Sequence, residues 1–187
     1  MSAPVFPAAA RLRARSPRGA AGAVVLLAAV PLALASSIAF GRGAELIIHV
    51  ALGLSFALIA FAVFDFRLPR ALQFAAFAAI VTLAALFSLQ AVSEVTPALR
   101  HVAYDVLGQR LEKSLGYVFL LWCACVLVFD SKGVVRIVGA LVFVAVAGAE
   151  IYAFTLSRSG VAPPQALKLL YLPLFVWLLL ESLKPRD

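Results

Sequence analysis

The feature that most constrains this chain is a succession of apolar runs, each bounded by charged or turn-forming residues. A helix that crosses a membrane needs about 20 mainly apolar residues, because the hydrocarbon layer is about 30 Å thick. We predict six helices from these runs, at residues 20–40, 44–64, 71–92, 115–129, 137–157 and 166–183. The sequence shows no internal repeat or second domain, so we expect one all-α transmembrane bundle over residues 18–187.

The composition indicates an integral membrane protein and excludes a water-soluble domain. Of the 187 residues, 64% are hydrophobic and 13% are charged, and the mean hydropathy is +1.05. So few charged side chains cannot cover the surface of a soluble domain of this size. The formal net charge is +7, but most basic residues stand at the ends of apolar runs, where they orient helices and meet anionic headgroups. We therefore expect membrane lipids as partners, and no nucleic acid.

The basic residues also predict an orientation, because short loops rich in Lys and Arg tend to stay in the cytoplasm. With the N-terminus inside, ten of the 16 Lys and Arg residues fall on the cytoplasmic side and six outside. Six spans then return the C-terminus to the cytoplasm. The fourth run is the shortest, since its strictly apolar part covers only Tyr117–Phe129. If that run is re-entrant, the C-terminus lies outside.

The N-terminal region predicts a flexible cytoplasmic tail at residues 1–17, which are rich in Pro, Ala and Arg. The basic residues of this tail, the apolar run and Ala33-Leu34-Ala35 also have the order of a secretory signal. We favour an uncleaved anchor. Cleavage would leave five spans in the same orientation.

Polar side chains within the apolar runs are the candidate functional residues, because an unpaired charge at the bilayer centre costs about 3 kcal/mol or more. Glu45 and His49 are four apart and share a face of the second helix, and Gln90 and Glu94 are four apart at the end of the third. Glu150 lies about two turns from the outer end of the fifth helix. All five fall in the outer half of the membrane, so we expect them to meet the following loop in one pocket.

The loop after the third run predicts an interfacial amphipathic helix at residues 97–114. Thr96 can cap its first turn, and apolar residues recur along it with a helical period. His101, Asp105 and Gln109 recur every fourth residue, which permits a His–carboxylate hydrogen bond on one face. Such a helix can equally serve only to seal the headgroup layer.

Nothing in the sequence predicts a catalytic residue, a metal site or a cofactor. Cys123 and Cys125 are two apart, so on a helix they point about 200° from each other and cannot jointly bind a metal or form a disulfide. The two histidines lie in different environments, which disfavours haem ligation. The sequence has no nucleophile elbow, phosphate-binding glycine loop or zinc-binding spacing.

The stretch Thr96–Tyr117 (TPALRHVAYDVLGQRLEKSLGY) resembles the signature loop of the VanZ-like membrane proteins, in which an Arg is followed by D-x-x-x-N and then a Gly-ended helical segment. The positions of that motif are occupied by Arg100, Asp105, Gln109 and Gly116. The segment Glu45–His49 is similar to the family's acidic-Lys-x-x-His entry. The chain departs from the family's pattern at Glu45, Leu46, Gln90, Ser93, Gln109 and Glu112.

The resemblance covers about a third of the chain. It implies a small polytopic protein of the bacterial cytoplasmic (inner) membrane, with its polar motif at the outer face. Some members of the family are linked to reduced susceptibility to a lipoglycopeptide antibiotic.

Three functions are open from the sequence. The first is a non-enzymatic envelope protein whose outer pocket binds a lipid or lipid-linked headgroup, with Arg100 as the clamp on its anionic group. The second is an accessory subunit of a larger membrane assembly, in which polar residues only hold helices together. The third is a membrane enzyme that uses a His and a carboxylate on a lipid headgroup. We rank them in this order, because no nucleophile or metal set supports the third.

Overall fold

The computed structural model describes residues 15–40, 43–160 and 171–185, and over these ranges the chain is helical without a β-strand. The prediction of an all-α fold is confirmed. The α-helices are α1 (Pro17–Phe40), α2 (Ala44–Ala62), α3 (Arg70–Val95), α4 (Lys113–Phe129), α5 (Gly133–Arg158) and α6 (Leu172–Leu183). The 3-10 turns are η1 (Val63–Asp65) and η2 (Pro97–Leu99), and η3 (His101–Glu112) is a π-helix.

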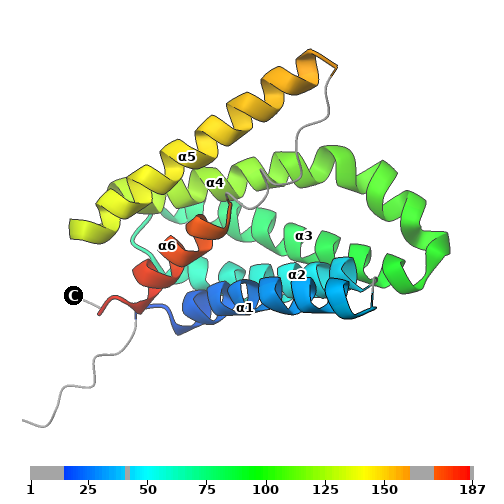
Figure 1. Cartoon of the computed structure of the whole chain (residues 1–187). Coiled ribbons are helices and arrows are strands. Elements are labelled where there is room, and N and C mark those ends of the chain that lie inside the picture. Colours follow the sequence, from blue (N-terminus) through cyan, green and yellow to red (C-terminus); the bar gives the residue numbers. More distant parts are fainter. Residues whose placement is uncertain (1–14, 41–42, 161–170, 186–187) are drawn as a thin grey trace, which may run out of the picture.

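Each helix packs against the next one in the chain, and α6 returns to pack against α1. Figure 1 shows α1 to α4 running side by side, with the chain reversing at each connection and α5 tilted away from the others. The starts of α1, α3 and α5 therefore lie at the same end as the ends of α2, α4 and α6. We term this the Arg15 end, after the cluster of Arg15, Asp65, Asp130 and Glu181. The opposite end, which carries Glu45, Glu94 and Arg100, is the Glu94 end.

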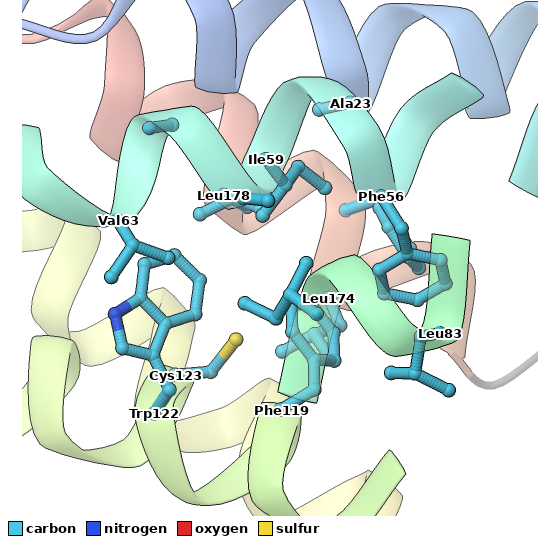
Figure 2. Packing of buried hydrophobic residues seen from close by; sticks show 14 of the residues in the cluster. Ala23, Phe56, Ile59, Val63, Leu83, Phe119, Trp122, Cys123, Leu174 and Leu178 are labelled. Carbon is cyan, nitrogen blue, oxygen red and sulfur yellow. The ribbon is translucent and has the colours of Figure 1, made fainter. Parts of the chain in front are cut away.

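The apolar core lies between α1, α2, α3, α4 and α6 (Figure 2). Its largest members, Trp122 of α4 and Trp177 of α6, are fully buried. Their rings pack against other aromatic rings, Trp122 against Phe66 and Phe119 and Trp177 against Phe143, and such contacts add to the gain from burial. Figure 2 labels residues from each of these five helices and Val63 of η1: Ala23, Phe56, Ile59, Val63, Leu83, Phe119, Trp122, Cys123, Leu174 and Leu178.

Helix α5 stands largely outside this core. In the apolar 18-residue stretch of α5 only 17% is buried, whereas 39–44% is buried in the corresponding stretches of α1, α2 and α3. It is attached through Trp177, whose ring nitrogen donates to the Val135 carbonyl at 3.1 Å. Gly139 leaves the space that the Trp177 ring occupies. One face of α5 therefore holds it to α6, and most of its surface has no partner within the described part of the chain.

Small residues let α1 and α2 approach closely. Ala23 and Ile59 have no exposed surface, and the Ser55 hydroxyl donates to the Gly22 carbonyl at 2.8 Å. Close backbone approach through small residues, with a hydroxyl bond between helices, is a common way for apolar helices to associate in lipid.

The Arg15 end is closed by the carboxylate of Glu181, which is fully buried. One oxygen accepts from Arg15 Nη1 at 3.3 Å. The other accepts from Ser131 Oγ at 2.7 Å and from Lys184 Nζ at 2.8 Å. A buried carboxylate is tolerated only when it is paired and hydrogen-bonded, so these donors hold α1, α6 and the α4–α5 connection together.

The same end contains two further carboxylates. Asp130, at the C-cap of α4, binds the Arg15 guanidinium and accepts the Arg67 backbone N–H at 2.8 Å. Asp65 accepts from the Ser16 hydroxyl at 2.8 Å, and Ser16 Oγ also accepts the Gly19 backbone N–H at 3.1 Å, as an N-cap residue does. The start of α1 is thereby tied to the α2–α3 and α4–α5 connections.

These contacts correct the predicted tail. Arg15 and Ser16 are bound to the bundle, and the Arg15 backbone N–H donates to the Lys184 carbonyl at 2.8 Å. Arg15, Ser16 and Pro17, which the sequence placed in a tail at residues 1–17, therefore belong to the bundle, because Arg15 and Ser16 pair with it and Pro17 begins α1. Residues 1–14 lie outside the described ranges.

Four helical segments in the described ranges are long and apolar enough to cross a membrane: Pro17–Ser36, Ala44–Asp65, Arg70–Val95 and Gly133–Leu156. The shorter apolar helices are α4, with 17 residues, and α6, with 12. The predicted helical bundle with long apolar segments is confirmed, and the count of six spans stays a prediction. Residues 166–170 of the sixth predicted run lie outside the described ranges.

The loop predicted as one amphipathic α-helix at residues 97–114 has a different local structure. It consists of the turn η2 and the π-helix η3, which continues directly into α4. A π-helix bonds residues five apart. The side chains of Asp105 and Gln109 lie outside the described residues, so their predicted alignment with His101 stays a prediction.

We expect Gly22→Ala to destabilise the bundle. A Cβ atom at Gly22 would lie 2.8 Å from the Ser55 carbonyl oxygen and 2.9 Å from Ile59 Cγ1, and such overpacking costs about 1–3 kcal/mol. The midpoint of thermal unfolding in detergent should fall. Gly148→Ala on α5 is the matched control, because nothing lies within 4 Å of that Cβ position. Equal midpoints for the two variants would contradict the close α1–α2 packing.

Candidate functional site

A pocket of about 390 Å³ opens at the Glu94 end of the bundle. It is lined by side chains from α2, from α3 and from the connection to α4, namely Glu45, Glu94, Arg100, His101 and Tyr104. Its volume lies in the range of about 300–1,000 Å³ that is typical of small-molecule sites.

Local sequence positions these residues. Gly43 has φ +95°, a conformation that suits glycine, and it turns the chain into α2 so that Glu45 lies in the first helical turn. At the end of α3, Thr96 leaves the helical conformation and Pro97 starts the 3-10 turn. A residue that precedes proline is disfavoured in α-helix. The chain therefore reverses here and brings Arg100 back toward Glu94.

The Glu94 carboxylate is the centre of the site. One oxygen accepts from Arg100 Nη2 at 2.8 Å, and the other accepts from the Tyr104 hydroxyl at 2.5 Å. The Glu94 side chain is 11% exposed and the Arg100 side chain is 57% exposed. The carboxylate is therefore held inward by two donors, and the guanidinium keeps an open side toward the pocket mouth.

The titration of the loop residues follows from this geometry. Burial raises the pKa of the Tyr104 hydroxyl, and its hydrogen bond to the Glu94 carboxylate raises that pKa further. The same carboxylate raises the pKa of Arg100 through its hydrogen bond and charge. At neutral pH the site therefore holds a protonated tyrosine donor and a charged guanidinium.

His49 extends the site inward along α2. Its Nδ1 lies 3.4 Å from the Tyr104 hydroxyl oxygen. Its ring stacks against Phe87 of α3, with the ring centroids 6.4 Å apart. His49 is thus connected through Tyr104 to Glu94, and Glu45 and His101 line the same pocket.

Gln90 lies next to this site without lining the pocket. It is 1% exposed, and its Nε2 donates to Glu112 Oε2 at 3.2 Å. Its other amide atom, Oε1, is buried without a partner in the described structure. Gln90 therefore ties α3 to the end of η3.

Glu150 does not join the pocket. It accepts hydrogen bonds from the hydroxyl of Tyr117, at 3.1 Å, and from that of Tyr171. The reason is that α5 packs on α4 and α6, whereas the pocket forms between α2, α3 and the loop. The predicted convergence of α2, α5 and the loop is corrected to α2, α3 and the loop. The side chains of Asp105 and Gln109, which were also predicted here, lie outside the described residues.

Several residues that the structure brings into polar clusters were not among the predicted site residues. Tyr104 and Glu112 lie in the loop, and a search for ionisable side chains within apolar runs does not select them. Glu181 could have been found, because it is an acidic residue inside the sixth apolar run, like Glu150 in the fifth. Asp130 and Arg15 stand at helix ends in the sequence, where charge is ordinary, so only the fold reveals that they are paired.

No group of three or more His, Cys, Asp or Glu side chains in the described ranges is arranged to hold a metal ion. The acceptors and donors of the pocket instead suit hydrogen bonding and ion pairing with a polar ligand.

Comparison of the chain with protein-family models, with curated protein sequences and with solved structures finds no match. Function is therefore inferred from the geometry of the site.

We expect Tyr104 to keep its proton above pH 10. Its raised pKa means that its bond to Glu94 contributes stability below the ordinary tyrosine pKa of about 10 and loses it as the pH rises through the higher folded-state value. Ultraviolet titration of folded wild type and Tyr104→Phe should give curves that coincide up to pH 10 and separate above it. In denaturant, the variant should lack the step of one tyrosine near pH 10. A difference between the folded proteins near pH 10 would refute the Glu94–Tyr104 bond.

Proposed function

We propose that this chain is a non-enzymatic, VanZ-like protein of the bacterial cytoplasmic membrane, and that its pocket at the Glu94 end binds the polar headgroup of a lipid in the outer leaflet. The observation that carries the proposal is the meeting of Glu45, Glu94 and Arg100 in one open pocket at the end of an apolar bundle.

The distribution of charge supports an orientation with the Arg15 end in the cytoplasm and the Glu94 end outside. Basic residues gather at the Arg15 end, at the starts of α1, α3 and α5 and beyond the end of α6: Arg15, Arg18, Arg67, Arg70, Lys132, Arg136 and Lys184. Loops of this kind stay in the cytoplasm. The pocket then faces the outer leaflet, and both termini face the cytoplasm.

Six spans are part of the proposal. The 17 residues of α4 extend about 25 Å at 1.5 Å per residue, and η3 continues directly from the start of α4. A helical path long enough for the hydrocarbon layer of about 30 Å is thereby available. Helix α6 contacts both α5 and α1, which supports placing α6 in the membrane beside these two helices.

The charges of the pocket favour a headgroup that carries both signs. Glu45 and Glu94 are two carboxylates, and Arg100 is already paired with one of them. An anion without a positive group would be repelled by the carboxylate of Glu45. A phosphate with an attached amine fits better, because the open side of the guanidinium can bind phosphate oxygens and Glu45 can bind the ammonium group.

Apolar surface near the pocket supports a lipid over a soluble ligand of the same charge. Ile48, Val95 and Val102 are 37%, 68% and 42% exposed, and each lies within a few residues of a pocket residue. Acyl chains can cover these side chains while the headgroup occupies the pocket.

We expect purified wild-type protein to retain phosphatidylethanolamine in native mass spectrometry. Arg100→Gln removes the phosphate contact and Glu45→Gln removes the ammonium contact. Each should weaken retention by about ten-fold, the size of one lost charge-assisted bond of about 1.5 kcal/mol or more. Phosphatidylglycerol has no amine, so Glu45→Gln should not weaken its retention.

The matched control is Arg158→Gln. Arg158 ends α5, and its guanidinium lies 5.2 Å from the centre of the Phe154 ring, outside the pocket. This variant should retain phosphatidylethanolamine as wild type does. Equal retention of phosphatidylethanolamine by all variants would contradict the proposal that the pocket binds a headgroup.

An accessory subunit is a second candidate, and the exposure of α5 favours it. Exposed apolar side chains follow one face of this helix at alternating intervals of three and four residues, namely Val134, Ile137, Leu141 and Val144. This spacing forms a seam that another helix can pack against.

If α5 docks a partner subunit, truncating the seam should release it. The variant Ile137→Ala/Leu141→Ala/Val144→Ala should lose a polypeptide that co-elutes with wild type in mild detergent at a fixed ratio. The control Val24→Ala/Leu32→Ala/Leu34→Ala truncates exposed side chains of α1 and should keep the partner. Elution of wild type as a single monodisperse polypeptide would exclude this role.

A further inference from the structure

A second cavity lies at the Arg15 end, on the opposite side of the bundle from the proposed headgroup pocket. It has a volume of about 170 Å³ and is lined by Arg15, Asp65, Arg67, Asp130, Lys132, Lys184 and Pro185. One water molecule takes about 30 Å³ in the liquid, so the cavity has room for a group of several heavy atoms.

Part of the charge in this cavity is used by the fold itself. Arg15 is held by Asp130 and Glu181, and Lys184 is held by Glu181. Asp65 accepts from the Ser16 hydroxyl, and Asp130 accepts the Arg67 backbone N–H. The carboxylates thus already accept from donors of the protein, which disfavours a cation as the occupant.

The balance of charge is positive. Four cationic side chains line the cavity, against Asp65, Asp130 and the adjoining Glu181. The side chains of Arg67 and Lys132 are exposed at the rim, and Lys184 is partly exposed. The exposed guanidinium of Arg67 and the exposed ammonium of Lys132 at one opening provide donors and charge that suit a phosphate with several anionic oxygens.

We propose that this cavity is a phosphate-binding site on the cytoplasmic side, with Arg67 and Lys132 as the rim contacts above Arg15 and Lys184. The group bound is a phosphate monoester, because it carries about −1.5 to −2 charge at pH 7. It belongs either to an anionic lipid of the inner leaflet or to a soluble phosphate compound. The site is independent of the headgroup pocket, since the two share no residue.

The test uses Arg67→Gln/Lys132→Gln, which removes the rim charges but leaves the Arg67 backbone N–H on Asp130 and the buried ion pairs. The matched control is Arg136→Gln, an exposed arginine in the first turn of α5 that does not line the cavity. Unfolding midpoints without phosphate establish that each variant is folded. If the double variant does not fold, Lys132→Gln alone takes its place.

Two probes distinguish the sources. Inorganic phosphate is titrated against chloride at matched ionic strength, with the unfolding midpoint in detergent as the measurement. Phosphatidic acid is offered against phosphatidylcholine, with retained lipid in native mass spectrometry as the measurement. Wild type and Arg136→Gln should respond to phosphate or to phosphatidic acid, and the double variant should need about ten-fold more of the same probe.

A response to inorganic phosphate supports a site for soluble phosphate compounds, and a response to phosphatidic acid alone supports a lipid site. The proposal is overturned if phosphate acts no differently from chloride and phosphatidic acid is not retained. It is also overturned if the double variant responds as Arg136→Gln does.

Discussion

The burial of the Glu181 carboxylate among apolar helices is the constraint on which the rest of the structure depends. A charge in such a setting must be paired. Two of its partners come from distant parts of the chain, Arg15 before α1 and Ser131 between α4 and α5, and the third, Lys184, follows three residues later. Satisfying one carboxylate therefore brings the start of α1 and the α4–α5 connection to the end of α6. Asp130 also binds the Arg15 guanidinium, so the same group of ion pairs fixes the C-terminus of α4.

Closing one end in this way leaves the other end free to serve as a site. At the Glu94 end no comparable set of buried ion pairs ties all the helices in the described structure. The polar residues gather instead around Glu94, between α2, α3 and the loop, and Arg100 stays largely exposed. The two ends therefore differ: buried ion pairs hold the helices together at the Arg15 end, whereas the guanidinium that pairs with Glu94 stays largely exposed. The tilt of α5 separates Glu150 from this group and leaves α5 more exposed than α1, α2 and α3.

The helices and part of the site were predictable, for different reasons. Long apolar runs bounded by charges specify helices through the length that burial requires, and α1 to α5 follow those runs with shifts at the boundaries. Glu45, His49 and Glu94 were found because polar groups in apolar runs need partners. Tyr104 and Glu112 were not, since they lie in the polar loop and not within an apolar run. Glu150 was assigned to the wrong neighbours, because the sequence predicts how deep the residue lies along its helix but does not predict which helices its side chain faces.

The sequence by itself determined that the chain forms apolar helices with charge at their ends, because hydrophobicity and helical spacing are local properties of consecutive residues. Tertiary structure alone decided which charges meet. Arg15 and Glu181 are 166 positions apart, and the residues next to either one do not predict that the two will pair. Their pairing follows from the ring of helix contacts that returns α6 to α1, and the same ring decides that α3 rather than α5 completes the pocket beside Glu45.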